Sequence, residues 1–239
     1  MRAFISGIGW VTAGGTGMGR NTHSFELSEG PLPKLAGKMI FENQSFRRFG
    51  RLDRFSKVGL SAIAYALQDA GLDIWKEKRE IGIIASTLFG CLATDFDYYN
   101  TVMPKDGLLA DPNLFTYTLP NTFLGHASII FGLTGTNFII NEKTNTGLSA
   151  LRSALDCLSL GECGTMLAGI CDVECPPNFP MSEKTAPGSV FVVLEQTIGK
   201  RSHQPYGELT MDKAGAIFFN ESEIKDISMC VKKCMNVGG

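Results

Sequence analysis

Residues 118–147, TLPNTFLGHASIIFGLTGTNFIINEKTNTG, contain the pattern that decides the fold. A turn at 119–121 precedes a segment with helical spacing, and a glycine-bounded connection leads to an apolar strand at 137–140. A polar corner at 142–146 then passes directly into a helix that opens at Gly147. In α/β sheets such junctions carry chemistry, because the corner projects a side chain beyond the sheet and the helix presents free N–H groups. We therefore predict an α/β fold with a functional corner at this junction.

The residue order within this stretch is P-N, then G-H-x-S-I-x-F-G-L-x-G-x-N, a short strand, the corner, and G-L-x-A-L-x-x-A-L. This order resembles the β-ketoacyl-acyl carrier protein synthase family of the thiolase fold. In that family the corner carries an acyl-accepting cysteine three residues before the glycine that opens the helix. Counting back from Gly147 places Thr144 at that position. The resemblance implies a thiolase-like half, with a mixed central sheet flanked by helices, whose nucleophile is replaced.

Further segments support the resemblance over residues 1–200, which we expect to form a ketosynthase-like N-terminal domain. They are S-G-I-G at 6–9, D-R-F-S at 53–56, A-L-x-D-A-G-L-D at 66–73 and V-L-E at 193–195. The thiolase fold consists of two similar halves, and the resemblance covers the first. We expect residues 201–239 to be a C-terminal extension of unclear role.

Hydrophobic periodicity and turn residues predict the following elements. Strands are expected at 2–11, 81–86, 165–171 and 190–195, with edge strands at 206–210 and 216–219. Helices are expected at 53–71, 147–160 and 221–235, a glycine-rich turn at 12–19, and loops at 21–49, 98–111 and 176–187. Gly7 and Gly9 form a G-x-G, but the third glycine and the later acidic residue of a dinucleotide-binding loop are missing.

Composition excludes several classes of partner. The 239 residues are 44% hydrophobic and 19% charged, with a net charge of −2. Because Lys and Arg form no basic stripe, we expect no nucleic-acid partner. No apolar run approaches the roughly 18 to 20 residues that a membrane span needs, and no signal peptide is evident. We therefore expect a cytoplasmic protein, and we expect no cofactor.

Seven cysteines occur at irregular spacing within or beside apolar segments. The pairs Cys171/Cys175 and Cys230/Cys234 could together supply four zinc thiolates, but the spacing differs from that of a zinc knuckle. We favour reduced, packed thiols and no metal site.

The chemistry of the corner follows from its residue types. A threonine hydroxyl has no anionic population comparable to that of a thiolate unless a base lies beside it. Lys143 is the adjacent candidate base, although consecutive corner residues usually point apart. The resemblance implies that the loop at 87–91 lies near an acyl pocket, and we assign to that pocket Phe89, Cys91, Gly125, His126 and Lys143. Cys91 is an alternative nucleophile, although no basic residue is near it in sequence.

The resemblance also implies what the second half would supply, namely two histidines and an oxyanion-hole donor. The histidines here are His23, His126 and His203, and none stands where decarboxylation of an extender unit needs one. Family members pair through the strand before the corner, which here contains Asn137, Phe138, Ile139 and Ile140. We also expect a large exposed apolar face that a homodimeric or heterodimeric partner would cover.

Three functions remain open at this point. The first is a non-condensing protein of fatty acid or polyketide synthesis, either a chain-length-factor-like partner of a ketosynthase or a binder of acyl chains or acyl carrier protein. The second is an acyltransferase or acyl-thioester hydrolase that acts through Thr144 or Cys91, and the third is a structural or regulatory association module. Carrier-protein docking needs a basic patch, and the candidates are Arg47, Arg48, Arg51 and Arg54.

Overall fold

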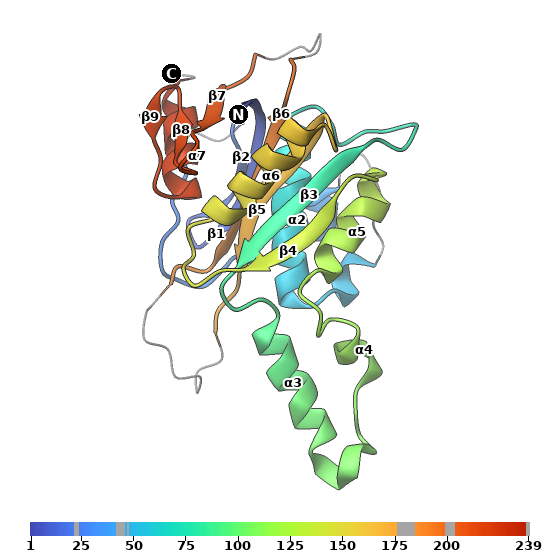
Figure 1. The fold of residues 1–239 in the computed structure, drawn as a ribbon. Helices are drawn as coiled ribbons and strands as arrows, with labels where there is room; N and C mark the ends of the chain where they lie inside the picture. The colour runs from blue at the N-terminus through green and yellow to red at the C-terminus, as the bar shows by residue number, and fades with distance from the viewer. Residues whose placement is uncertain (22–23, 42–45, 47, 176–184, 199–203, 238–239) are drawn as a thin grey trace.

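A nine-stranded sheet is the centre of the part of the chain that the structure describes (Figure 1). The structure is a computed structural model that describes residues 1–21, 24–41, 46, 48–175, 185–198 and 204–237. The strands are β1 (Arg2–Thr12), β2 (Gly15–Met18), β3 (Ile81–Thr87), β4 (Asn137–Asn141), β5 (Thr165–Asp172), β6 (Gly188–Glu195), β7 (Gly207–Met211), β8 (Ile217–Phe219) and β9 (Ser222–Glu223). The helices are α1 (Gly37–Ile40), α2 (Arg54–Asp69), α3 (Leu92–Val102), α4 (Pro112–Phe115), α5 (Thr122–Phe131), α6 (Leu148–Leu160) and α7 (Ile227–Val237), with 3-10 turns at Phe49–Arg51 and Pro104–Gly107.

The sheet is mixed, which confirms the predicted fold class. Its strand order is β4-β3-β5-β6-β1-β7-β8-β9, and β2 joins β1 as a hairpin. β3 pairs in parallel with β4 and with β5, whereas the remaining named pairs are antiparallel. Parallel strands need crossover connections. The segment that contains α3, α4 and α5 connects β3 to β4, and α6 connects β4 to β5 on the other side of β3. The carboxyl ends of β3, β4 and β5 therefore lie at one edge, where the corner is.

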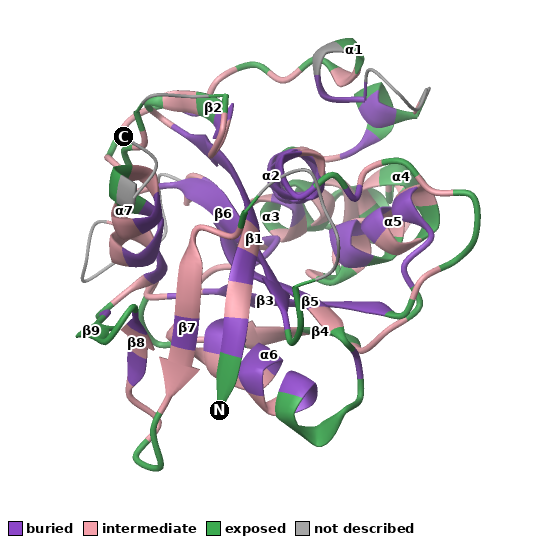
Figure 2. Cartoon of the chain, turned by 90° about the horizontal axis from the view of Figure 1, so that it is seen from above, coloured by how far each residue is buried: buried purple, intermediate pink, exposed green. Residues whose placement is uncertain are grey.

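Helices cover both faces of the sheet. On one face α2 and α5 pack around Phe123, whose ring centroid lies 5.3 Å from that of Phe55 and 6.4 Å from that of Phe191. On the other face α6 and α7 bury Leu151 and Val231 against the sheet. Figure 2 shows that the central strands and most of α2 are buried. A strand such as β3, buried along its whole length, is the result of this two-sided cover.

Two glycines let α2 lie directly on β1. A Cβ at Gly7 would come within 2.4 Å of the Ala66 carbonyl oxygen, and one at Gly9 within 2.2 Å of the Ala66 nitrogen. The G-x-G therefore lies within β1 and serves close packing between helix and strand, which the sequence did not indicate. The predicted turn at 12–19 is wrong in part, because 15–18 form β2. Gly15, with φ of +125°, permits a turn tight enough to fold this segment back onto β1.

Two other predicted elements need correction. The expected loop at 98–111 begins inside α3, since no helix breaker precedes Pro104. The expected helix at 221–235 starts only at Ile227, because Asp226 caps it by accepting a hydrogen bond from the Met229 N–H at 2.6 Å, and 222–223 form β9 instead. Residues 176–184 of the expected loop at 176–187, together with His23 and His203, lie outside the described residues.

The C-terminal segment continues the same sheet and core. β7 pairs with β1 from Arg2↔Thr210 to Ile5↔Gly207. Phe219 of β8 and Ile227 of α7 are buried in the core that α6 forms on its face of the sheet. No helix in the described part of the chain is long and apolar enough to cross a bilayer.

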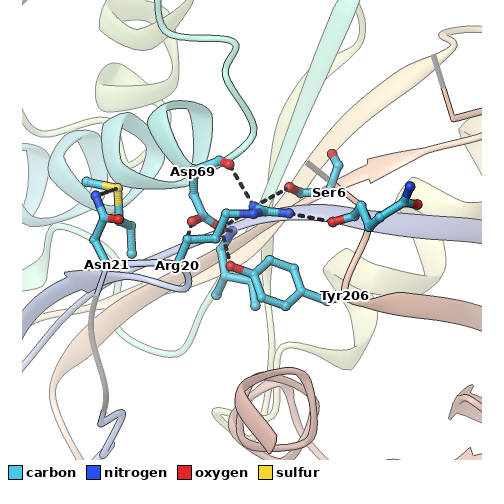
Figure 3. A network of polar contacts seen from close by, with 8 residues as sticks. Ser6, Arg20, Asn21, Asp69 and Tyr206 are labelled. Atoms are coloured by element: carbon cyan, nitrogen blue, oxygen red, sulfur yellow. Dashed lines mark hydrogen bonds and ion pairs between the residues drawn. The ribbon is translucent and has the colours of Figure 1, made fainter. Parts of the chain in front are cut away.

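A buried polar network ties the N-terminal and C-terminal segments to α2 (Figure 3). The Asp69 carboxylate accepts hydrogen bonds from the N–H groups of Ile8 and Arg20 and from the Tyr206 hydroxyl, each at 2.8 Å. The Arg20 guanidinium lies 3.2 Å from the Asp69 carboxylate and 4.5 Å from the Tyr206 ring centroid, and it donates to the Ser6 carbonyl at 3.0 Å. A single carboxylate thus joins β1, the end of the β2 hairpin, α2 and the segment before β7.

We expect Asp69→Ala to lower the free energy of unfolding by about 3 kcal/mol, because it removes the opposite charge beside the Arg20 guanidinium and the acceptor of two backbone N–H groups. Tyr206→Phe removes one hydrogen bond and should lower the same quantity by about 1 kcal/mol. Urea denaturation measures both changes. Asp97→Ala, at an exposed position on α3, is the control and should stay within about 0.5 kcal/mol. An Asp69→Ala effect as small as that of the control would contradict this assignment.

Candidate functional site

The corner between β4 and α6 is closed by the side chain of Glu142. Its Oε1 accepts a hydrogen bond from the Ser149 N–H at 2.8 Å, and its Oε2 accepts one from the Gly147 N–H at 3.2 Å. The Thr146 hydroxyl oxygen accepts from the Leu148 N–H at 3.4 Å. The first N–H groups of α6 therefore bind side chains of the corner itself. The sequence placed Glu142 in the corner but did not indicate this role.

Only glycine fits at the position that opens α6. Gly147 has φ of +73°, and a Cβ there would lie 2.6 Å from Ile170 Cγ2 and 3.1 Å from the Ile227 side chain. The Ile227 N–H at the start of α7 also donates to the Thr146 carbonyl at 2.8 Å. The corner is thus held in place by contacts with Ile170 of β5 and with Ile227 of α7.

The two polar residues at the tip of the corner point into solvent. Thr144 and Lys143 are both exposed, and neither side chain makes a hydrogen bond or ion pair with a described residue. A Lys143–Thr144 pair of the kind that would activate the hydroxyl is therefore not formed within the described part of the chain.

The loop after β3 is held by a buried carboxylate at the end of β5. Asp172, 1% exposed, accepts hydrogen bonds from the Thr87 hydroxyl at 2.8 Å, the Leu88 N–H at 3.0 Å and the Phe89 N–H at 2.9 Å. Burial raises the pKa of Asp172 to about 6, although these hydrogen bonds act to lower it. The Glu142 N–H donates to the Thr87 carbonyl at 2.8 Å, so this loop and the corner lie side by side.

Cys91 follows this loop, and its surroundings oppose reactivity. The residue is 3% exposed, and its Sγ lies 3.6 Å from both Asp95 carboxylate oxygens. Burial and the neighbouring Asp95 raise the pKa of the thiol to about 12, so it stays protonated near neutral pH. Gly90 has φ of +59°, and a Cβ placed there would lie 3.3 Å from the Pro120 Cβ.

Gly125 and His126 lie on α5, which packs on the other face of the sheet from α6. The His126 ring is tilted against Phe46 and Tyr117, with centroids 6.0 Å and 6.3 Å apart. Burial lowers the pKa of the imidazole, and its Nε2 has no hydrogen-bond partner in the described part of the chain. Gly125 is exposed and has open space where a Cβ would stand. Phe89 lies in the loop after β3 and Lys143 in the corner beside that loop, while His126 belongs to an aromatic cluster in another layer.

The predicted arginine patch is divided by an ion pair. Arg54 binds Glu174 through two hydrogen bonds, at 2.8 Å from Nε and 2.6 Å from Nη2, and also donates to the Leu32 carbonyl. Burial alone would raise the pKa of Glu174, but the bonds from Arg54 and Leu32 lower it to about 2. Arg54 therefore holds the start of α2 to the end of β5. Arg48 and Arg51 lie at the 3-10 turn before α2, and Arg47 lies outside the described residues.

The strand predicted for pairing is an edge strand with exposed apolar residues. β4 ends the sheet, and its burial alternates little, with Phe138 38% exposed. Thirteen large apolar side chains are exposed among the described residues, and nine of them lie between Phe96 and Phe138. Seven of these nine lie between Phe96 and Leu119, on α3, on α4 and in the segments beside them, and both helices extend away from the carboxyl edge of the sheet (Figure 1). Ile129 on α5 and Phe138 on β4 are the two of these nine that lie beside the edge of the sheet.

No metal cluster forms among the described residues. In the described part of the chain no three His, Cys, Asp or Glu side chains gather as metal ligands. Cys171 is buried on the α2 face of the sheet, whereas Cys230 and Cys234 are buried on the α6 face, so these thiols cannot share one ion. A cavity of about 420 Å³ is lined by Glu208, Thr210, Asn220 and Glu221 on the β7–β9 side, away from the corner.

We expect Asp172 to make the free energy of unfolding fall as the pH rises from about 4 to about 6.5. The folded state holds the Asp172 proton more tightly than the unfolded state, so this contribution is fully present below pH 4 and is lost as the pH passes 6. A shift of about two pKa units corresponds to about 3 kcal/mol. Asp172→Asn should remove this part of the pH dependence in urea denaturation at a series of pH values.

The control for this pH series is Glu174→Gln. The lowered pKa of Glu174 contributes stability that is present above pH 4.5 and is lost as the pH falls toward 2. Glu174→Gln should therefore change the profile below pH 4.5 and leave the higher window unchanged. Equal slopes above pH 4.5 in the wild type and in Asp172→Asn would contradict the raised pKa.

The sequence of the chain is similar to the sequences of several characterised proteins. The chain is 28% identical over 120 residues to 3-oxoacyl-[acyl-carrier-protein] synthase 2 of Vibrio cholerae serotype O1, which covers 50% of this chain and 29% of that protein. It is 30% identical over 190 residues to Nodulation protein E of Rhizobium leguminosarum bv. trifolii, which covers 70% of this chain and 46% of that protein. The chain thus spans less than half the length of these curated relatives.

Solved structures share the fold. A chain of the ishigamide ketosynthase/chain length factor aligns with a TM-score of 0.68 and 16% identity, covering 87% of this chain and 62% of that one. A chain of the ketosynthase ApeO in complex with its chain length factor ApeC, from Xenorhabdus doucetiae, aligns with a TM-score of 0.60 and 15% identity, covering 83% of this chain and 81% of that one. Residues 38–181, more than half of the chain, match the N-terminal domain of beta-ketoacyl synthases. The chain therefore belongs to the beta-ketoacyl synthase family, and the part of that family it matches is the N-terminal domain.

Proposed function

We propose that the chain is a non-condensing, ketosynthase-like subunit of fatty acid or polyketide assembly, and that it pairs with a cysteine-bearing ketosynthase as a chain length factor does. The observation that carries this proposal is the corner, where an exposed Thr144 takes the place of the acyl-accepting cysteine. Its hydroxyl has no base within hydrogen-bonding reach among the described residues, so it lacks the activation that a serine or threonine nucleophile needs.

The alternative of acyl transfer or hydrolysis has less support. Acylation of Thr144 would require a proton acceptor that the described residues do not provide. Cys91 is buried, and the raised pKa of its thiol leaves almost no thiolate near neutral pH. No specific contact in the described part of the chain favours either residue as a nucleophile.

The side of the molecule that carries β4 is the surface that suits a partner. An edge strand offers unpaired backbone groups, and a second protein can extend the sheet from it. The exposed side chains Ile129 and Phe138, on α5 and β4, add apolar area beside these groups. Two of the structural neighbours, described above, are complexes of a ketosynthase with a chain length factor, which supports a partner of this kind.

The opposite side is less suited to association. Among the described side chains of α6 and α7, Leu160 is the one large apolar residue that is exposed. Arg152 on the outer side of α6 donates to the Gly215 carbonyl at 2.8 Å, which fixes the β7–β8 connection over the helix. The C-terminal segment thus covers apolar surface that α6 would otherwise leave exposed.

Carrier-protein docking is the second part of the proposal. Arg48 and Arg51 are the described members of the basic cluster that do not pair with Glu174. An acidic carrier protein would therefore meet these two guanidinium groups rather than Arg54.

We expect the wild-type chain to acquire no acyl adduct when it is incubated with acyl-loaded carrier protein, as measured by intact-protein mass spectrometry. The reason is the absence of an activated nucleophile at the corner. Thr144→Ala and Cys91→Ser are the matched controls. An adduct lost only in Thr144→Ala would make Thr144 a nucleophile, and one lost only in Cys91→Ser would assign the chemistry to Cys91; either result would contradict the proposal.

We expect Phe138→Asp to weaken binding to the cysteine-bearing ketosynthase of the same source organism by at least about tenfold, because a charge on the apolar edge strand must be desolvated in the complex. Biolayer interferometry with the purified proteins measures the dissociation constant. Asn236→Asp adds the same charge to an exposed position on α7 and should leave binding unchanged.

Equal binding by the wild type and Phe138→Asp would contradict the assigned surface. A complex that forms but leaves the condensation rate and the product chain length unchanged would favour the structural association module instead.

A further inference from the structure

The N-terminus of α6 is occupied by a negatively charged side chain of the same chain. Glu142 engages the N–H groups of Gly147 and Ser149, and Thr146 engages that of Leu148. These three consecutive groups carry the positive end of the helix dipole. They are the groups that would otherwise favour an anion at the corner.

An acyl-transfer corner would use these groups differently. A thiolate at a helix N-terminus has a lowered pKa because free N–H groups and the dipole favour its charge. A carboxylate that already holds those groups weakens this effect, and its own charge disfavours a second anion nearby. The Glu142 carboxylate therefore competes with any nucleophile placed at 144.

The surrounding contacts keep Glu142 in this place. Its own N–H extends the β3–β4 pairing by donating to the Thr87 carbonyl at 2.8 Å. On the other side of the corner, the Ile227 N–H binds the Thr146 carbonyl, and the Ile227 side chain lies against Gly147. The corner is held at both ends, and Gly147 leaves no room for an added side chain.

We propose that Glu142 is the internal anion of the corner, a positioning residue that satisfies the α6 N-terminus and so prevents it from activating a nucleophile at 144. This inference deepens the proposed non-condensing role and rests on it. Two features then oppose reactivity at the corner, the threonine in place of the cysteine and the Glu142 carboxylate at the α6 N-terminus. Restoring the thiol alone therefore does not restore a reactive site.

The test is the pKa of a thiol introduced at the corner, compared between Thr144→Cys and the double variant Glu142→Gln/Thr144→Cys. Glutamine keeps the shape and one acceptor but removes the charge. The charged side chains on the elements that meet here are Glu142 and Lys143 of the corner, Asp172 at the end of β5, Arg152 and Asp156 on α6, Asp226 before α7, and Lys232 and Lys233 on α7. Glu162→Gln/Thr144→Cys is the matched control, since Glu162 binds Thr136 beyond the far end of α6.

The pKa is obtained from the pH dependence of iodoacetamide alkylation, with peptide mapping to separate residue 144 from the seven native cysteines. We expect Thr144→Cys and the Glu162 control to titrate near or above the ordinary value of about 8.5, and the Glu142→Gln double variant to titrate about one unit lower. Equal pKa values in Thr144→Cys and the Glu142→Gln double variant, or a value already well below 8.5 in Thr144→Cys alone, would overturn the proposal.

Binding of Glu142→Gln to the ketosynthase partner is measured separately. A lowered thiol pKa without partner binding would leave the role of Glu142 standing and overturn the proposed function. Partner binding with an unshifted thiol pKa would support the proposed function and overturn the role of Glu142.

Discussion

The Asp69 carboxylate is 3% exposed, and it receives hydrogen bonds from residues 8, 20 and 206 at one point beside α2. A buried charge is tolerated only where donors and an opposite charge surround it, and here Arg20 supplies the charge. Because these partners come from the first strand, the hairpin and the segment before β7, the carboxylate sets how β1 lies on α2. Gly7 and Gly9 then allow the close approach of β1 to α2, and β1 pairs with β6 on one side and β7 on the other. The corner depends on this arrangement, since α7, which braces it, follows directly from β7–β9.

The elements that the sequence predicts well are those whose signals are local. The strand at 137–141, the glycine that opens α6 and the buried strands β3 and β6 carry their periodicity and punctuation within a few residues. Contacts across long sequence separations could not be predicted in this way. Arg54 belongs to a basic cluster in the sequence, yet it binds Glu174, which lies 120 residues later. Asp172 holds a loop more than 80 residues before it, and nothing in its neighbourhood indicates this. Sequence patterns therefore placed the corner correctly but could not distinguish Glu142, which turns inward, from Lys143 and Thr144, which face solvent.

The distribution of apolar surface separates the two sides of the sheet. On the α6 side, β8 and α7 bury Phe219, Ile227 and Val231, so residues near the C-terminus cover surface built by residues near the middle of the chain. On the β4 side Ile129 and Phe138 remain exposed, and an open sheet edge lies beside them. Exposed apolar patches and open edges are both unfavourable for an isolated protein, and natural proteins usually cover them. Their coincidence on one side is the physical basis for placing a partner there.

A catalytic corner and a structural corner differ in whether the backbone N–H groups at the start of the helix are left without hydrogen-bond acceptors. An acyl-transfer site must leave donors unsatisfied in the resting state, because they have to meet charge that develops only during the reaction. Unsatisfied donors lower stability, so a corner that no longer reacts is free to satisfy them internally. The Glu142 carboxylate satisfies the N–H donors of α6, and the Thr146 carbonyl accepts a hydrogen bond from the Ile227 N–H. A threonine at 144 fits the same logic, since a neutral, exposed hydroxyl does not compete with Glu142 for the helix N-terminus. Under the proposed non-condensing role, the threonine at 144 and the Glu142 carboxylate belong together, because the corner then serves to join β4, α6 and α7 and not to hold a nucleophile.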